Sequence, residues 1–152
     1  MLGEYLNNFY LPASNQGALY TENGFDGARK IAAWKAHVRN AWGGVTLRRL
    51  DTPCKRISFG DVVHYSIAAR LNGLQPEDVV VELLVCRQFK GSKPCDFKHF
   101  RFEASGVEET GEHLFQLNLA PELCGRLEYY IRIYPYQSLL THPLEMGLMV
   151  WL

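Results

Sequence analysis

The residues with reactive side chains are scattered along this chain. The five histidines are His37, His64, His99, His113 and His142. No serine, cysteine or carboxylate accompanies them at a spacing that recurs in known nucleophile motifs. The acids Glu108 and Glu109 adjoin Gly111 in a predicted turn, where solvated side chains are expected. We therefore predict packing or surface roles for the histidines and assign no catalytic residue.

The four cysteines do not form a metal-binding motif. They stand at positions 54, 86, 95 and 124 without a CxxC pair, whereas a zinc site needs ligands clustered at short spacing. Free buried thiols are therefore the prediction.

The composition is that of a globular chain with no charge bias. The 152 residues are 47% hydrophobic, which is enough for one domain with a real core. Sixteen Lys and Arg balance sixteen Asp and Glu, so no excess positive charge is present to hold nucleic acid or an anionic membrane surface. The first residues include Glu4, Asn7 and Asn8 and do not resemble a signal peptide. A cytoplasmic protein with neither nucleic acid nor a membrane as its partner is expected.

Residues 1–43 have the periodicity of helices. The segment EYLNNFYLP predicts one or two helical turns that Pro12 stops, and SNQGALYTENG predicts a loop. Residues 25–44 predict the main helix, which Asp26 can cap and which Gly43 and Gly44 end. Its apolar residues recur at three- and four-residue steps and form a stripe that must be covered. The stripe consists of Ile31, Trp34, Val38 and Trp42.

From Val45 onward the hydrophobic period changes to two. Turn signals such as LNGLQPED and KGSKP separate short alternating runs, with no intervening helices. Seven or eight antiparallel strands are predicted: VTLRRL, KRISF, VVHYSIAARL, DVVVELLVCRQF, HFRFEA, HLFQLNL, LEYYIRIYPY and GLMVWL. We predict a mainly β chain, in which a helical segment over residues 1–43 packs on one sheet of an immunoglobulin-like β-sandwich over residues 44–152.

Three of the predicted strands carry apolar side chains on both faces. The runs VVVELLVC, LEYYIRIY and GLMVWL each have a core-facing set, and their reverse side still carries residues such as Leu84, Tyr130 and Met149. A sheet face this apolar is expected to be covered. The predicted cover is the helix stripe with Trp34 and Trp42, packed against Met149, so that the last strand is buried on both faces.

Several stretches of the sequence resemble one known family. These are EYLNNFYLPA, KIAAWKAHVRNAWGGV, LQPEDVVVELL, GEHLFQLNL and above all GRLEYYIRIYPYQSLLTHPLEMGLMVWL. They look like the C-terminal end of bacterial and archaeal α-glucan phosphorylases, relatives of glycogen phosphorylase. The similarity covers nearly the whole chain, and HPLEMGL with the Trp that follows it is the most specific part.

The resemblance implies a parent enzyme that is a large two-lobed glycosyltransferase with pyridoxal phosphate on a lysine. Such enzymes remove glucose from the non-reducing end of an α-1,4-glucan by attack of inorganic phosphate, giving glucose 1-phosphate. In the family the catalytic lobes precede the helix that EYLNNFYLPA resembles, and 152 residues without a glycine-rich helix start do not suffice for two such lobes. We therefore expect an accessory domain that is not itself an enzyme and that has no cofactor or metal of its own.

Two functions stay open for the domain itself. In the first it is structural and packs on the catalytic lobes of its own parent chain, or on a second copy in a homo-oligomer. In the second it binds α-1,4-glucan, because sugar rings stack on flat aromatic faces and an arginine among them supplies a polar donor. The predicted binding set is Tyr130, Arg132, Tyr134, Tyr136 and Trp151. A helix over the face that carries Tyr130 and Trp151 favours the first function, and an open aromatic face favours the second.

Overall fold

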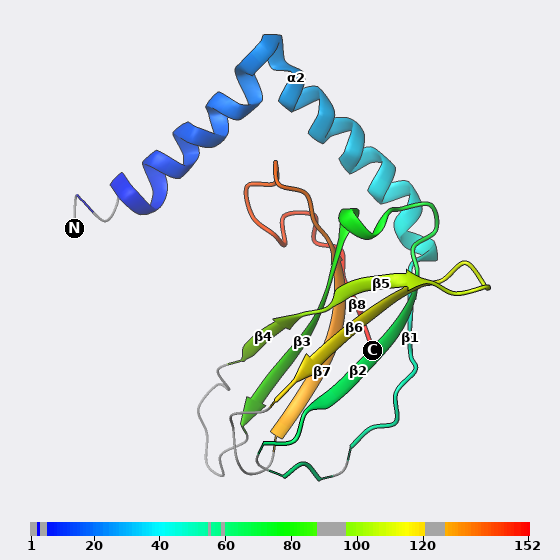
Figure 1. Cartoon of the computed structure of the whole chain (residues 1–152). Helices are drawn as coiled ribbons and strands as arrows, with labels where there is room; N and C mark the ends of the chain where they lie inside the picture. Colours follow the sequence, from blue (N-terminus) through cyan, green and yellow to red (C-terminus); the bar gives the residue numbers. More distant parts are fainter. Residues whose placement is uncertain (1–2, 4–5, 55, 59, 88–96, 121–126) are drawn as a thin grey trace.

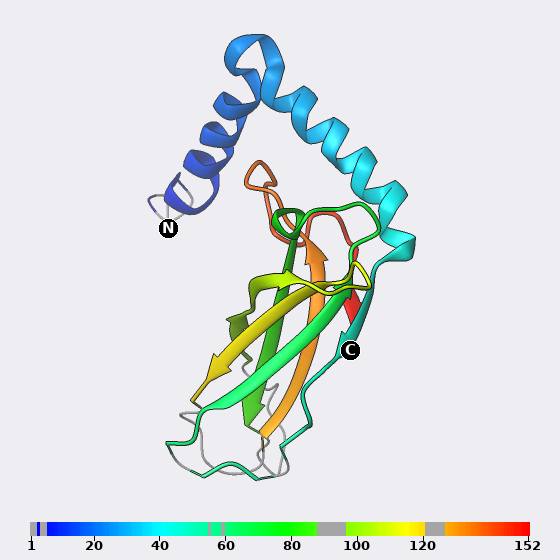
Figure 2. The same ribbon diagram turned by 45° about the vertical axis from the view of Figure 1, so that its right-hand side comes forward.

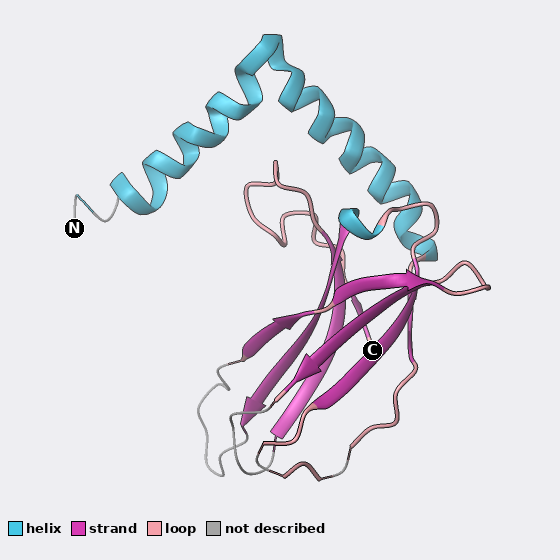
Figure 3. Cartoon of the chain, in the orientation of Figure 1, coloured by secondary structure: helices cyan, strands magenta, loops and turns pink. Residues whose placement is uncertain are grey.

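The chain forms two facing β-sheets with a long bent helix at one end. The computed structural model describes residues 3, 6–54, 56–58, 60–87, 97–120 and 127–152. Within these residues, eight strands form two four-stranded antiparallel sheets, and the helix stands beyond their end (Figures 1 and 3). The predicted mainly β fold with an N-terminal helix is thereby confirmed. The immunoglobulin-like label and the domain boundary between residues 43 and 44 stay predictions.

The two sheets have the strand orders β1-β2-β6-β5 and β4-β3-β7-β8. The strands are β1 (Thr46–Arg49), β2 (Val63–Arg70), β3 (Val79–Arg87), β4 (Lys98–Arg101), β5 (Glu103–Val107), β6 (His113–Leu119), β7 (Leu127–Pro135) and β8 (Val150–Trp151). Two short 3-10 turns, η2 (Trp42–Gly44) and η3 (Pro76–Asp78), precede β1 and β3. The three strands predicted to share one sheet do so as β3, β7 and β8, and β4 pairs with β3 at the edge of that sheet.

Two predicted strands differ from the structure. The run HFRFEA is two strands, because the chain passes from one sheet to the other at Phe102. The N–H of Phe102 still donates to the carbonyl oxygen of Val81 at 2.9 Å, whereas Glu103 already pairs with Gln116 of β6. In the run KRISF, the described residues 56–58 form no strand.

The core lies between the sheets and is built by alternate residues, as the period of two requires. The main contributors are Val63, Tyr65, Ile67 and Ala69 of β2, Val79, Val81, Leu83 and Val85 of β3, and Ile131 and Ile133 of β7. Their buried side chains are the ones that the alternation in the sequence places on the inner faces.

The helical segment is one bent helix and not two helices separated by a loop. A short π-helical turn, η1 (Leu6–Tyr10), leads into α2 (Leu11–Ala41). Pro12 lies in the first turn of α2, where its missing N–H is not needed, so it does not stop the helix. The predicted loop over residues 14–24 is therefore mostly helical, and only residues 22–25 leave the helical conformation. Three of these four residues have a positive φ, which turns the chain sharply.

The bend divides α2 into a first arm, residues 11–21, and a second arm, residues 26–41. The second arm ends in the sandwich core, where Val38, Ala41 and Trp42 are buried together with residues of both sheets. One turn before Val38, Nε1 of Trp34 donates to Oδ1 of Asp78 at 2.6 Å, and Asp78 directly precedes β3. The helix therefore packs on the end of the sandwich and not across a sheet face (Figure 1).

Both arms are also tied to one loop, the β7–β8 loop over residues 136–149. In the first arm, Nε2 of Gln16 and the hydroxyl of Tyr20 each donate to the carbonyl oxygen of Leu139 at 2.6 Å. In the second arm, Lys35 forms an ion pair with Glu145. The loop lies beneath the bend, between the arms and the sandwich (Figure 2). These contacts fix the direction in which the first arm leaves the sandwich.

Candidate functional site

The outer face of the β4-β3-β7-β8 sheet carries the densest group of polar and aromatic side chains that share one surface. We define this outer face by the residues that point away from the core: Val80, Glu82 and Leu84 of β3, His99 and Arg101 of β4, Tyr130, Arg132 and Tyr134 of β7, and Trp151 of β8. Arg101, Glu82, Arg132 and Trp151 are direct cross-strand partners and form one row across all four strands. Direct partners share a face and touch, so the row acts as a unit.

Glu82 is the buried charge at the centre of this row. Glu82 is only 3% exposed and is the one charged residue in the apolar run of β3 from Val79 to Cys86. Its Oε1 accepts a hydrogen bond from Nε of Arg132 and forms an ion pair with Nη2 of the same guanidinium, and its Oε2 lies 3.3 Å from Nδ1 of His99. A carboxylate is tolerated in such a place only when it is paired and hydrogen-bonded. The pairing also holds the guanidinium of Arg132, whose side chain is 12% exposed, in a single orientation.

The guanidinium of Arg132 lies over two aromatic rings. Its central carbon is 5.3 Å from the ring centroid of Tyr134 and 5.5 Å from that of Trp151, within the range of a cation–π contact. The remaining nitrogen, Nη1, lies 3.9 Å from Sδ of Met149, and a thioether is a weak acceptor. Nη1 of Arg132 can therefore still donate a hydrogen bond to a stronger acceptor beside Trp151.

Two aromatic rings at this end of the row are open to solvent. Trp151 is 52% exposed and Tyr130 is 45% exposed. Their ring centroids are 6.3 Å apart at an interplanar angle of 85°, a favourable edge-to-face arrangement. Tyr130 meets Phe97 in the same way, at 5.9 Å and 68°.

These exposures correct two predictions. The helix does not cover the outer face, because α2 packs on the end of the sandwich instead. The last strand is also not buried on both faces: Val150 packs against the core, whereas Trp151 and Leu152 are exposed.

The structure separates the five residues of the predicted binding set. Tyr130, Arg132 and Trp151 come together at the open end of the row. Tyr134 is buried, and its burial, followed by the negative charge of Glu82, raises the pKa of its phenol. Tyr136 is half-buried beside Arg101, whose guanidinium carbon lies 5.3 Å from the ring centroid.

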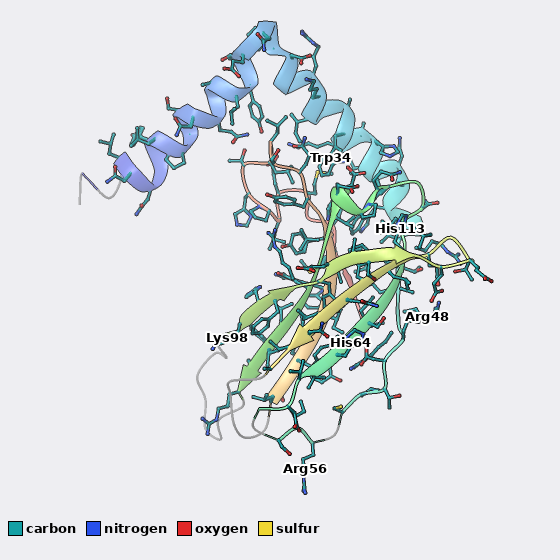
Figure 4. All side chains as sticks on the ribbon, in the orientation of Figure 1. Trp34, Arg48, Arg56, His64, Lys98 and His113 are labelled. Carbon is teal, nitrogen blue, oxygen red and sulfur yellow. The ribbon has the colours of Figure 1, made fainter. Side chains whose placement is uncertain are left out.

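The predicted helix-packing residues lie in the following places. Ile31, Val38 and Trp42 are buried, Trp34 is half-buried between the second arm and the sandwich (Figure 4), and Met149 is half-buried beside Arg132.

The sequence analysis missed Glu82 and His99. The signal for Glu82 was present, because it is the one charge in the apolar run VVVELLVC. A charge at such a position requires an opposite charge on a neighbouring strand. Arg132 is the charge on the outward side of LEYYIRIY, but the register that joins the two strands is not visible in the sequence.

Two of the other histidines bond residues that do not belong to this face. Nδ1 of His64 is 2.7 Å from Oδ1 of Asn118, and Nδ1 of His142 accepts the N–H of Leu144. Figure 4 shows His64 and His113 at different places on the sandwich. Within the described ranges, no three His, Cys, Asp or Glu side chains are arranged to hold a metal ion.

The prediction of free buried thiols is wrong for the two cysteines that the structure describes. Cys54 is free but exposed, and Cys86 is buried but forms a disulfide. Cys95 and Cys124 lie outside the described residues.

In the described part of the chain, no helix is both long and apolar enough to cross a membrane.

Comparison with known proteins identifies the family. The chain is 28% identical to maltodextrin phosphorylase of Thermococcus litoralis, over 99% of this chain and 18% of that protein. It is 25% identical to the glycogen phosphorylases of Mycobacterium bovis and Mycobacterium tuberculosis, over 97% of this chain and 17% of theirs. The chain thus spans less than a fifth of the length of these relatives. No solved structure matches it significantly. The family model described as the glycogen phosphorylase C-terminal domain matches residues 42–152, and the chain belongs to this family.

Proposed function

We propose that this chain is the C-terminal accessory domain of an α-glucan phosphorylase and that its own role is structural and not catalytic. The parent enzyme would be a cytoplasmic glycosyltransferase that phosphorolyses α-1,4-glucan to glucose 1-phosphate. The family membership and the names of the relatives support this, as does the small share of their length that the chain spans.

The first arm of α2 is the observation that carries the structural role. The apolar side chains exposed along η1, this arm and the bend are Leu6, Tyr10, Leu11, Leu19 and Phe25. The second arm, by contrast, ends in the core of the sandwich. A helix with one end buried in its own domain and apolar side chains exposed on the other is suited to join two bodies. We propose that the first arm packs on the catalytic lobes of the parent chain.

The β7–β8 loop would make this joint rigid. It holds the first arm through Leu139 and the second arm through Glu145. A helix tied on both sides of its bend transmits the position of one body to the other, so the loop would set the orientation of the sandwich on the lobes.

The cofactor of the parent would lie outside this chain. Pyridoxal phosphate needs a lysine that forms a Schiff base within an enclosed site. Among the described lysines, Lys30 and Lys98 are exposed, and Lys35 is ion-paired with Glu145. None of the three fits a cofactor lysine, so we assign pyridoxal phosphate to the lobes.

A phosphorolysis assay tests the non-catalytic role. The pure chain, incubated with maltodextrin and inorganic phosphate, is expected to release no glucose 1-phosphate and to show no Schiff-base absorbance after incubation with pyridoxal phosphate. Turnover by the pure chain would contradict the proposal.

A binding experiment tests the docking role. The chain is mixed with the remainder of the parent enzyme, expressed separately, and association is measured by analytical ultracentrifugation. Leu11→Asp and Leu19→Asp are expected to weaken association at least tenfold, since each places a charge in an apolar contact. Val62→Asp, at an exposed position of the sandwich, is the matched control and is expected to leave association unchanged. Equal effects of all three variants would rule out the arm as the docking surface.

A further inference from the structure

The outer face has features that the structural role does not use. The arms of α2 rise from one end of the sandwich and do not cover Tyr130 and Trp151 on this face (Figures 1 and 2). Trp151 and Tyr130 are both about half exposed on it, on adjacent strands. Large aromatic rings exposed side by side above a sheet are unfavourable unless they meet a partner.

The exposed rings are held in place from below. Arg132 lies over the ring of Trp151, and its guanidinium is itself fixed by a hydrogen bond and an ion pair with the buried Glu82. Tyr130 supports Trp151 edge to face. A surface whose side chains are already ordered loses little conformational entropy when a ligand binds.

Two polar groups on the same face, Arg132 next to the rings and His99 two strands from Tyr130, can take further hydrogen bonds. Nη1 of Arg132 faces the weak sulfur acceptor of Met149, and His99, half exposed, contacts Glu82 through Nδ1 and not through Nε2. Such groups can bond the hydroxyls of a ligand whose rings lie on the aromatics. The charges of Glu82 and Arg132 compensate each other, so this end of the row does not favour an ionic ligand.

The exposed part of the face extends over more than one aromatic ring. Tyr130 and Trp151 lie on adjacent strands with their ring centroids 6.3 Å apart, whereas Glu82 and Leu84 beside them are buried. A neutral ligand with apolar ring faces and hydroxyl edges, extended over more than one ring, matches this surface. A chain of sugar rings has this chemistry.

We propose that the outer face, with Trp151 and Tyr130 as the stacking rings and Arg132 and His99 as the hydroxyl partners, is a binding site for an α-1,4-glucan chain. The identity of the glucan rests on the proposed function, whereas the site itself rests on the geometry above. Binding there would hold one part of a long polymer while another part reaches the lobes, which raises the effective concentration of chain ends.

Tryptophan NMR signals of the unmodified chain test the site directly. The chain has three tryptophans, so its indole N–H signals are few and are assigned by Trp34→Phe, Trp42→Phe and Trp151→Phe. On titration with maltoheptaose, the Trp151 signal is expected to shift in a saturable way, while the signals of Trp34 and Trp42 stay in place. No shift at Trp151, or larger shifts at the other two, would overturn the proposal.

Affinity electrophoresis through amylose gives a second measurement. Wild-type protein is expected to be retarded by amylose and not by dextran, whose linkages are α-1,6. Trp151→Ala and Tyr130→Ala are each expected to weaken binding roughly 3- to 10-fold, the loss of one aromatic contact. Phe25→Ala is the matched control, because Phe25 is 59% exposed but lies at the bend of α2. Thermal melts verify that each variant is folded.

The outcomes separate this proposal from the structural role. Failure of amylose to retard the wild-type protein, or equal losses in Phe25→Ala, would overturn the glucan site and leave the docking of the first arm untouched. If amylose retards the wild-type protein while the arm variants associate with the remainder of the enzyme as tightly as wild type does, the docking of the first arm is overturned and the glucan site stands.

Discussion

Gly27, at the start of the second arm, lies against the main-chain carbonyl of Leu19 in the first arm. A Cβ atom at position 27 would overlap the carbonyl oxygen of Leu19, and main-chain atoms have little room to move. The sharp bend of α2 therefore depends on a residue without a side chain, as well as on the positive φ of the residues before it.

Gly27→Ala is accordingly expected to open the bend. The added methyl group must push the two arms apart, at a cost of about 1 to 3 kcal/mol, which is typical of overpacking. Spin labels at Ser14 and Ala36, both exposed, are expected to report a longer or broader distance distribution in the variant. Gly17→Ala is the control, because a Cβ there meets nothing within 4 Å. That helical substitution is expected to stabilise the protein by roughly 0.5 to 1 kcal/mol.

The two tryptophans of the helix stripe are expected to differ in their contribution to stability. Trp42 is buried in the core cluster, so Trp42→Ala is expected to cost about 3 to 5 kcal/mol in the free energy of unfolding. Trp34 is half-buried, and Trp34→Phe keeps most of the ring while removing the hydrogen bond to Asp78. That loss is expected to be about 1.5 to 3 kcal/mol, as for a hydrogen bond to a charged group. Urea melts of both variants give the two values, and a smaller cost for Trp42→Ala than for Trp34→Phe would contradict the burial of Trp42 in the core.

The strands were predictable because burial leaves a direct trace in the sequence. In β2 the core residues Val63, Tyr65 and Ile67 alternate with the polar residues His64 and Ser66, so the period of two could be read without the structure. The helix was less legible, since Pro12 and the Asn and Gly residues after it are typical helix breakers. Pro12 breaks nothing, because it occupies a first turn, where its geometry suits a helix.

The candidate site could be predicted only in part. Tyr130, Arg132 and Trp151 were found because they lie on one side of two predicted strands. The role of Glu82 depends on a pairing between residues 50 positions apart, which alternation alone does not specify. The covering of the outer face was predicted wrongly, because an apolar surface indicates that a partner is needed but not which element supplies it.

The contribution of the Glu82–Arg132 ion pair to stability can be tested by removing one or both charges. Glu82→Gln removes the charge that compensates Arg132, and breaking a buried pair in this way is expected to cost about 3 to 5 kcal/mol. The double variant Glu82→Leu with Arg132→Leu leaves no unpaired charge and is expected to be closer to wild-type stability. Urea melts of the single and double variants decide this, and a double variant less stable than Glu82→Gln would show that the pair stabilises the sheet by itself.

Asp51 is expected to govern part of the stability in acid. Its Oδ2 accepts hydrogen bonds from Nε and Nη2 of Arg49 at 2.9 and 2.6 Å, and its Oδ1 accepts the N–H of Ser66 at 3.0 Å. Burial opposes ionisation of this carboxyl, but the bonds from Arg49 and Ser66 outweigh it and lower its pKa. A carboxyl whose pKa is lower in the folded state stabilises the protein above its unfolded pKa of about 4.

The contribution of Asp51 is therefore present at neutral pH and is lost as the pH falls below about 4 toward the folded pKa. Asp51→Asn is expected to be less stable than wild type at pH 7, with a difference that shrinks as the pH is lowered to 3 and below. Urea melts at a series of pH values measure this difference, and Glu77→Gln, at an exposed position, controls for the loss of one carboxylate. A difference between wild type and Asp51→Asn that stays constant from pH 7 to pH 3 would mean that ionisation of Asp51 does not stabilise the fold, and that the bonds to Arg49 and Ser66 act only through their geometry.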